Sequence, residues 1–198
     1  MDKKSWDERY AADGLVWTAQ ANRFLVAETQ ALTPGRALDL AAGEGRNAVW
    51  LAEQGWQVHA VDFSARGIEK GKALAHKRSV AVEWEVTDLL EFEPQPAAYQ
   101  LVAILYLHLP WSAMRVVLER AAAAVAPGGT LLLVGHDRTN ITDGHGGPQD
   151  PAILYQPQEV AQALPGLRID RAEQVQRPVS TDAGERIAID CLVRARRA

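Results

Sequence analysis

Residues 38–52 read LDLAAGEGRNAVWLA, and this stretch decides the predicted fold. The apolar segment 36–41 is typical of a β-strand, the small residues 41–45 predict a turn, and apolar residues then recur at helical spacing over 46–54. Gly55 would cap that helix, and QVHAVDF at 57–63 predicts a second strand. Strand, turn, helix and strand in this order indicate a βαβ unit with parallel strands.

The same alternation continues along the chain. Further helices are expected over 21–32, 64–78, 111–126 and 156–165, and further strands over 81–89, 100–107, 130–136, 167–176 and 186–195. The last two strands predict an antiparallel hairpin. We therefore expect an α/β protein with a Rossmann-like, doubly wound seven-stranded sheet, mostly parallel with an antiparallel C-terminal strand.

The length of 198 residues predicts one domain. Within it we expect an N-terminal helical or lid segment (1–35), a cofactor-binding core (36–136), and a substrate loop with the C-terminal hairpin (137–198). The net charge of −4 argues against nonspecific binding to nucleic acid or to an anionic membrane. A single cysteine, Cys191, and the lack of a signal-peptide or membrane-spanning pattern predict a cytoplasmic protein.

Three acidic residues are expected at the carboxyl edge of the predicted sheet. Asp39, Asp62 and Asp88 each fall at the end of a predicted strand, and the turn after the first strand leaves backbone N–H groups open to a ligand. Taken alone, the turn and Asp62 fit a tight structural turn with a helix cap as well as a nucleoside site. Asp39 disfavours a pyrophosphate by charge repulsion, which argues against a dinucleotide.

With these residues in place, the chain resembles the class I S-adenosylmethionine-dependent methyltransferases. The matching stretches are LDLAAGEGRN, VHAVDFS, VTDLL, YQLVAILYLHLP and APGGTLLL, in the order and spacing of that family. The stretches WDERYAADG and GEGRNAVWLAEQGWQV look most like the tellurite-resistance and thiopurine-type branch, whose members act on small molecules.

The resemblance implies a cofactor site for S-adenosylmethionine, with S-adenosylhomocysteine as product. Its predicted residues are Asp39, Ala41, Gly43, Gly45, Asp62, Phe63, Asp88, Leu89 and Leu105. Asp39 and the turn residues Ala41, Gly43 and Gly45 would face the methionine part and the sugar. Asp62 would hold the ribose hydroxyls and Phe63 would pack on the adenine. Asp88 and Leu89 would contact the adenine edge, and the backbone near Leu105 the methionine amino group. Ala41 departs from the usual glycine and Gln100 from the usual aspartate of the family, and neither departure removes a predicted contact.

Aromatic residues crowd the N-terminal segment. In this branch such a segment closes over the cofactor, so Trp6, Tyr10 and Trp17 are expected to shield the sulfonium, whose charge is attracted to aromatic faces. Packing of the first helix explains the same residues equally well.

The candidate catalytic residues are His108, Tyr106 and His136, which follow the fourth and fifth predicted strands. A histidine in this position suits a general base for an acceptor that loses a proton, although a structural hydrogen bond explains His108 as well. Arg138 is a candidate for binding an acceptor carboxylate or for a surface ion pair. The five histidines and one cysteine show no paired metal-ligand spacing, so no metal is expected.

The predicted function is transfer of a methyl group to a small-molecule acceptor by in-line displacement. The alternative is a non-catalytic protein that binds S-adenosylmethionine or S-adenosylhomocysteine, and a nicotinamide-dependent oxidoreductase is a third reading that Asp39 disfavours. No nucleic-acid partner is expected, because LYLHLP stands where a base-directed methylase has Asn/Asp-Pro-Pro-aromatic. A monomer and a homodimer are both compatible with the sequence, and the acceptor is not identified by any motif in residues 138–152.

Overall fold

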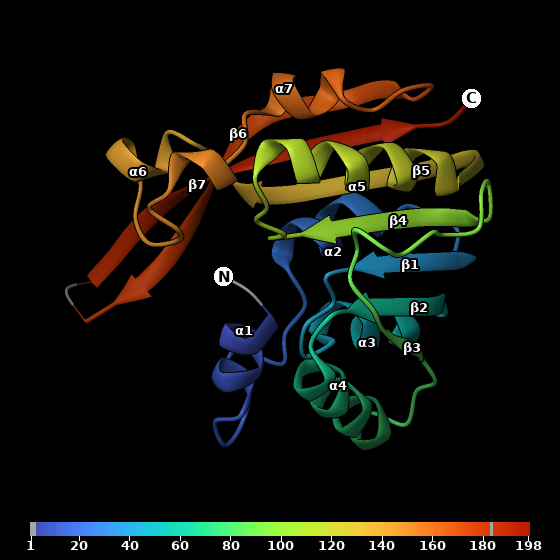
Figure 1. Ribbon diagram of the computed structural model, residues 1–198, viewed down its shortest axis with the longest axis horizontal. Coiled ribbons are helices and arrows are strands. Elements are labelled where there is room, and N and C mark those ends of the chain that lie inside the picture. The colour runs from blue at the N-terminus through green and yellow to red at the C-terminus, as the bar shows by residue number, and fades with distance from the viewer. Residues whose placement is uncertain (1–2, 183) are drawn as a thin grey trace.

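The computed structural model describes residues 3–182 and 184–198, which form an α/β fold around one sheet (Figure 1). The sheet has seven strands in the order β3-β2-β1-β4-β5-β7-β6. The strands are β1 (Arg36–Leu40), β2 (Gln57–Asp62), β3 (Glu83–Val86), β4 (Tyr99–Leu105), β5 (Val125–His136), β6 (Arg168–Thr181) and β7 (Gly184–Arg196). Only β7 runs against its neighbours, which confirms the predicted fold class.

Helices cover both faces of the sheet. They are α1 (Lys3–Tyr10), α2 (Arg23–Thr29), α3 (Arg46–Glu53), α4 (Ala65–Lys77), α5 (Trp111–Ala124), α6 (Asn140–Asp143) and α7 (Pro157–Gln162), with a 3₁₀ turn, η1 (Pro151–Ile153). Apolar residues of α2 and α3 pack on one face, and those of α5 and α7 pack on the other. Within the described residues, no helix is long and apolar enough to cross a membrane.

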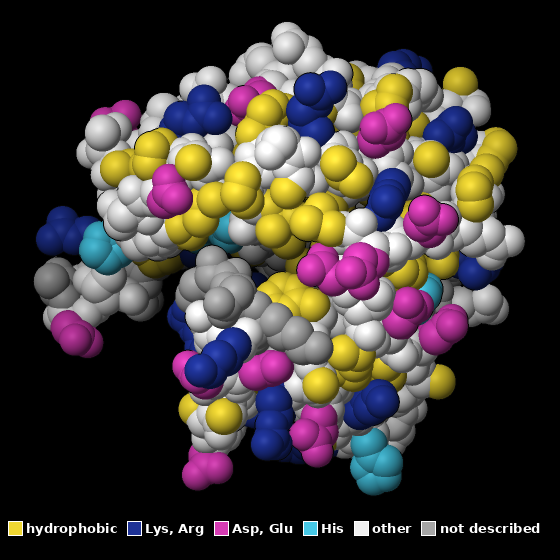
Figure 2. Space-filling model, viewed as in Figure 1, with side chains coloured by type: hydrophobic (Ala, Val, Ile, Leu, Met, Phe, Trp, Pro, Cys, Tyr) yellow, Lys and Arg dark blue, Asp and Glu magenta, His cyan; other side chains and the backbone are white. Residues whose placement is uncertain are grey.

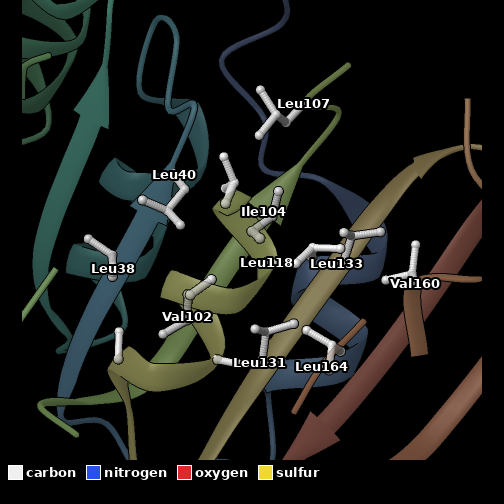
Figure 3. Close-up of a cluster of buried hydrophobic side chains, with 14 of the residues drawn as sticks. Leu38, Leu40, Val102, Ile104, Leu107, Leu118, Leu131, Leu133, Val160 and Leu164 are labelled. Atoms are coloured by element: carbon white, nitrogen blue, oxygen red, sulfur yellow. The ribbon is translucent and has the colours of Figure 1, made fainter. Parts of the chain in front are cut away.

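The core follows from the alternation of side chains along the buried parallel strands. Leu38 and Leu40 of β1 point toward α5, while Ala37 points toward α3. Figure 3 shows the α5 side, where side chains of β1, β4 and β5 meet Leu118. Because helices pack on both faces of the sheet, the central strands are rigid, and their carboxyl ends have fixed positions at one edge.

Several predicted boundaries are wrong at the N-terminal half of the sheet. The helix expected over 21–32 spans only Arg23–Thr29, because the Asn22 side chain caps it by accepting the N–H groups of Phe24 (2.8 Å) and Leu25 (3.2 Å). The strand expected over 81–89 spans only Glu83–Val86, so Asp88 does not end a strand but lies in the turn that follows.

The junction of α5 and β5 also differs from the prediction. The helix ends at Ala124 and β5 begins at Val125, so the strand starts before the Pro-Gly-Gly turn rather than after it. Pairing with β4 skips from Tyr99↔Val125 to Leu101↔Thr130, and the turn residues bulge from the ladder.

The C-terminal hairpin is longer than predicted. β6 extends to Thr181 and β7 begins at Gly184, because the residues expected to form a loop pair with each other instead. The last pair between β5 and β7 is His136↔Asp190. Residues 176–181 and 184–189 therefore form a two-stranded arm beyond the sheet, called the hairpin arm below. It lies at the left of Figure 1, beside α6.

Candidate functional site

The site is built where the parallel strands end. The carboxyl ends of β1, β2, β4 and β5 point to one edge, and α1, α6 and the hairpin arm lie beyond it (Figure 1). In Figure 2 the surface is hollowed between the projecting arm and the α1 end of the molecule. In open α/β sheets this edge is where ligands bind.

The turn between β1 and α3 has an unusual backbone. Ala41 (φ 62°), Gly43 (φ 55°) and Gly45 (φ 76°) all lie in the left-handed region. A Cβ atom on Gly43 would come within 2.7 Å of the Tyr10 hydroxyl, so a glycine is required there. Ala41 adopts the same left-handed conformation although it carries a side chain.

Asp62 braces this turn. Its Oδ2 accepts the N–H of Gly43 (2.8 Å) and its Oδ1 the N–H of Ser64 (2.8 Å), and the residue is buried. Burial raises the pKa of Asp62 despite these two hydrogen bonds. Each carboxylate oxygen keeps a second lone pair, so Asp62 can still accept a hydrogen bond from a ligand hydroxyl.

Asp39 is the most isolated polar group of the site. It is 1% exposed, and neither carboxylate oxygen accepts a hydrogen bond from the described residues. Burial, with the nearby charge of Asp62, raises its pKa to about 7, while Arg46 and the backbone N–H of Ala48, which lies near but outside hydrogen-bonding geometry, act in the opposite direction. A buried carboxylate without donors fits a ligand that brings a cation or an N–H group.

Arg46 is a site residue that the sequence reasoning missed. It is the first residue of α3, and no salt bridge joins it to a carboxylate among the described residues. Burial lowers its pKa, and the charge of Arg177 adds to that effect while Tyr106 and Asp39 oppose it. A half-buried guanidinium without an acidic partner is suited to a ligand carboxylate.

The N-terminal segment covers the turn. Oε1 and Oε2 of the buried Glu44 accept the N–H groups of Val16 and Trp17, each at 3.0 Å. Lys70 pairs with Glu44 at 3.2 Å and also donates to the carbonyl oxygens of Ala12 (2.8 Å) and Gly14. We call Glu44 and Lys70 with these contacts the Glu44 latch. It was not predicted, because nothing in the sequence distinguishes Glu44 from a solvated turn residue.

Three aromatic residues of the N-terminal segment pack together. The Trp6 ring stacks on Tyr10 (5.3 Å between centroids) and tilts against Trp17 (6.4 Å), and the Arg9 guanidinium lies over Trp6 and Trp17. Tyr10 is 5% exposed and meets Gly43, whereas Trp17 is 40% exposed. Tyr10 thus packs within the N-terminal segment and also lies where it can contact a ligand at the turn.

The predicted adenine contacts are dispersed at the end of β2 and β3. Phe63 is half-buried directly after β2, and Asp88 is exposed with its Oδ1 accepting the N–H of Leu90 (2.9 Å). The side chain of Leu89 packs in the α5-side core. Leu105, the last residue of β4, is buried on the α3 side.

Three rings form a second cluster at the ends of β4 and β5. The centroid of His136 lies 5.0 Å from that of Tyr106 and 5.3 Å from that of His108, with the two imidazoles nearly parallel. Burial lowers the pKa of His108 to about 3, and the neighbouring His136 adds to that effect, so His108 is neutral. Its Nε2 is buried without a hydrogen-bond partner in the described residues. The structure thus brings together the three residues that the sequence named as catalytic.

Asp190 of β7 lies beneath this cluster and was not predicted. Its side chain is fully buried, and Oδ2 accepts hydrogen bonds from the Tyr106 hydroxyl (2.7 Å) and from Nε of Arg177 (2.7 Å). Nδ1 of His136 lies 3.1 Å from Oδ1. Burial alone would raise the pKa of Asp190, but His136, Arg177 and Tyr106 together lower it. Asp190 is therefore a charged hub for the cluster.

The remaining candidates are engaged elsewhere. Arg138 binds Glu159 (2.9 Å) and the carbonyl of Leu154 (3.1 Å), so the ion-pair alternative for this residue is the one observed. Gln100 lies at the opposite edge, where its Oε1 accepts the N–H of Arg36 (2.8 Å). Within residues 3–182 and 184–198, no group of three or more His, Cys, Asp or Glu side chains is arranged to hold a metal ion.

The chain is similar in sequence to known proteins. The profile of a methyltransferase-domain family matches residues 37–129. The tRNA 5-carboxymethoxyuridine methyltransferase of Escherichia coli K12 is 33% identical over 105 residues, which cover 50% of this chain and 39% of that protein. The chain therefore spans less than half the length of this curated relative.

Solved structures share the fold over nearly the whole chain. A protein studied for the conversion of a disulfide bond into a thioacetal group during echinomycin biosynthesis superposes with a TM-score of 0.79 at 18% identity, covering 98% of this chain and 91% of that one. TehB from Haemophilus influenzae superposes with a TM-score of 0.76 at 16% identity, covering 99% of this chain and 67% of that one.

Proposed function

We propose that this chain is an enzyme that transfers a methyl group from S-adenosylmethionine to a small-molecule acceptor, since residues 37–129 match the profile of a methyltransferase-domain family. The observation that carries the proposal is the buried carboxylate of Asp39, whose oxygens accept no hydrogen bond. An orphaned buried acceptor is costly unless a ligand supplies the donor. The ammonium group of S-adenosylmethionine is such a donor.

The residues at the turn fit the cofactor part by part. Arg46 would pair with its carboxylate, opposite Asp39 and the amino group, and Asp62 would accept the ribose hydroxyls with its remaining lone pairs. The open backbone of Gly43 and Gly45 allows close approach. The further proposed contacts are Ala41, Phe63, Asp88 and the backbone of Leu89 and Leu105.

The bound cofactor supplies an electrophilic methyl group that an acceptor lone pair takes by in-line displacement. The chain positions the two reactants and excludes water from them. The Glu44 latch holds the segment with Tyr10 and Trp17 over the turn. The cluster of Tyr106, His108 and His136 borders the turn on the side of β5. Orienting two reactants in this way removes much of the entropic barrier.

A small-molecule acceptor suits the burial of the cluster. The side chains of His136 and Asp190 are 13% and 0% exposed, so little of either residue is open to a large acceptor. A net charge of −4 also argues against a polynucleotide. As part of this proposal we place the chain in the tellurite-resistance and thiopurine-type branch, and in the cytoplasm, where the buried thiol of Cys191 stays reduced.

Calorimetric titration with S-adenosylmethionine and S-adenosylhomocysteine tests the proposal. We expect the wild-type protein to bind both ligands, and Asp62→Ala to weaken binding by about 1–3 kcal/mol, roughly tenfold to hundredfold, since charge-assisted hydrogen bonds are lost. The Asp170→Ala variant is the matched control. The Asp170 carboxylate accepts a hydrogen bond from Arg168 and forms an ion pair with Arg196, but it lies on β6, away from the turn.

Two results would contradict the proposal in different ways. If neither ligand binds to the folded wild-type protein, the turn holds another ligand. If both bind but no acceptor is methylated, the alternative of a non-catalytic S-adenosylmethionine-binding protein is supported.

A further inference from the structure

The inference concerns the chemistry of the acceptor and rests on the proposed function. It starts from the contact between His136 and Asp190, which come from neighbouring antiparallel strands and face each other in register. Nδ1 of His136 is buried, and Oδ1 of Asp190 is 3.1 Å away. The contact is not aligned as a hydrogen bond in this conformation, which is common for catalytic pairs before substrate binds.

This contact favours a hydrogen on Nδ1 of the imidazole. An unprotonated Nδ1 would face a carboxylate oxygen at 3.1 Å with like partial charges, whereas an N–H there needs only a small ring rotation to donate a hydrogen bond. Asp190 is already balanced by the Arg177 guanidinium, with Nε at 2.7 Å from Oδ2. An imidazole that carries its one hydrogen on Nδ1 presents an unprotonated Nε2.

The other edge of the imidazole faces Gly147. A Cβ atom on Gly147 would lie 2.8 Å from Nε2 and 2.8 Å from Cδ2 of His136, so a side chain there would cover Nε2. A glycine is favoured at position 147 for two reasons, its φ of 74° and its close approach to the imidazole edge that carries Nε2. The neighbouring Gly146 has the same φ of 74° but nothing within 4 Å of its Cβ position.

We infer that His136 is the general base for the acceptor, that Asp190 is its positioning residue, and that the acceptor is a hydroxyl, thiol or amine compound whose reacting atom carries a proton. Nε2 takes this proton as the lone pair of the reacting atom forms a bond to the methyl carbon. The carbon–sulfur bond breaks, its electron pair stays on sulfur, and the imidazolium then releases its proton to solvent. His108 is less suited to this role because its partnerless imidazole is buried in an environment that resists a positive charge.

Imidazole ¹⁵N NMR tests the arrangement without any turnover. In the wild-type protein near neutral pH, we expect His136 to show a protonated Nδ1 and an unprotonated Nε2, with the resonances assigned by their loss in His136→Gln. Asp190→Asn should invert the tautomer, because the amide can donate to Nδ1. Asp170→Asn, a carboxylate on the same hairpin bound by Arg168 and Arg196, should leave the tautomer unchanged.

A probe titration tests the acceptor class. Phenol, which carries a proton, added to protein loaded with S-adenosylhomocysteine should shift the His136 Nε2 resonance, and benzoate, which has none to give at neutral pH, should shift it less. Gly147→Ala should abolish the phenol effect, whereas Gly146→Ala, equally strained, should retain it.

The outcomes separate this inference from the proposed function. A protonated Nε2 in the wild-type protein, or a larger shift with benzoate than with phenol, would overturn the inference even if the cofactor binds. The wild-type tautomer remains decisive if Asp190→Asn does not fold. Failure to bind S-adenosylhomocysteine would instead overturn the proposed function, while the tautomer is measured in the free protein.

Discussion

At the scale of single residues, Asp39 places a carboxylate at the buried end of β1 whose oxygens accept no hydrogen bond from the described residues. Most buried carboxylates are paired, so an unpaired one reduces the stability of the free protein. The same deficit favours a ligand that supplies a cation. Asp39 therefore lowers the stability of the ligand-free protein and, for the same reason, favours binding of a cationic ligand.

Replacing Asp39 by asparagine should stabilise the ligand-free protein at high pH. The pKa of Asp39 is raised from 3.8 to about 7 in the folded protein, so the folded state holds the proton more strongly than the unfolded state between these values. The stability contributed by this group is lost as pH rises from about 4 to about 7, by at most about 4 kcal/mol. Asp39→Asn avoids this loss. Urea unfolding across this range should show the variant gaining on the wild type as pH rises.

Asp170→Asn serves as the control, since its carboxylate is paired with arginines and removing it should give no gain at high pH. A difference between Asp39→Asn and wild type that does not change with pH would mean that Asp39 is paired in solution.

The sequence identified residues whose role follows from their place in a local motif. Asp39 and Asp62 lie in the last residues of β1 and β2, and these positions at the carboxyl edge were predicted correctly. Asp190 was missed because its partner Tyr106 is 84 residues away and β7 reads as an ordinary buried strand. Arg46 was missed because an arginine in the first turn of a helix is usually solvated.

At the scale of elements, the Glu44 latch joins the segment before α2 to the turn before α3. Glu44→Gln keeps the shape of the side chain but removes the charge that pairs with Lys70 and weakens the bonds from Val16 and Trp17. We expect a loss of about 1–3 kcal/mol in stability and faster amide hydrogen exchange over residues 12–17. Exchange measured by mass spectrometry checks this.

Glu53→Gln is the matched control, because Glu53 pairs with Arg78 at 3.3 Å on the surface and does not contact the N-terminal segment. If exchange over residues 12–17 is as fast in the wild type as in Glu44→Gln, the latch does not hold the segment closed in solution.

The alternation of strands and helices was predictable, whereas element ends were not. The ends of α2 and β3 depend on the Asn22 cap and on which residues of β3 find partners in β2. The full length of the hairpin arm was not predicted, because the expected strands end at residue 176 and begin again at residue 186, whereas Arg177 and Pro178 pair with Ala188 and Ile187. Such pairing depends on the opposite strand rather than on the local sequence.

At the scale of the whole molecule, ligand binding at the strand edge should stabilise the entire fold, because the turn joins β1, β2 and the N-terminal segment. At a concentration of S-adenosylhomocysteine about 100 times its Kd, the expected gain is about 2.7 kcal/mol. For a chain of this size that corresponds to a rise in Tm of roughly 5–10 °C. Differential scanning calorimetry measures the shift.

Adenosine triphosphate is the control ligand, since its phosphates would face Asp39 where the cofactor has an amino group, and its shift should be much smaller. Equal shifts from both ligands would indicate that the turn recognises only adenosine.

The order of strands leaves the sheet with two open margins, β3 and β6, each with unpaired backbone groups that a second chain could extend into a larger sheet. β3 offers only four residues. β6 is long, but it carries charged side chains, an irregularity between Ile169 and Arg171, and Pro178, which cannot donate a backbone hydrogen bond. These features oppose strand addition from a neighbouring molecule, so the long hairpin can border the site without making the protein prone to aggregation.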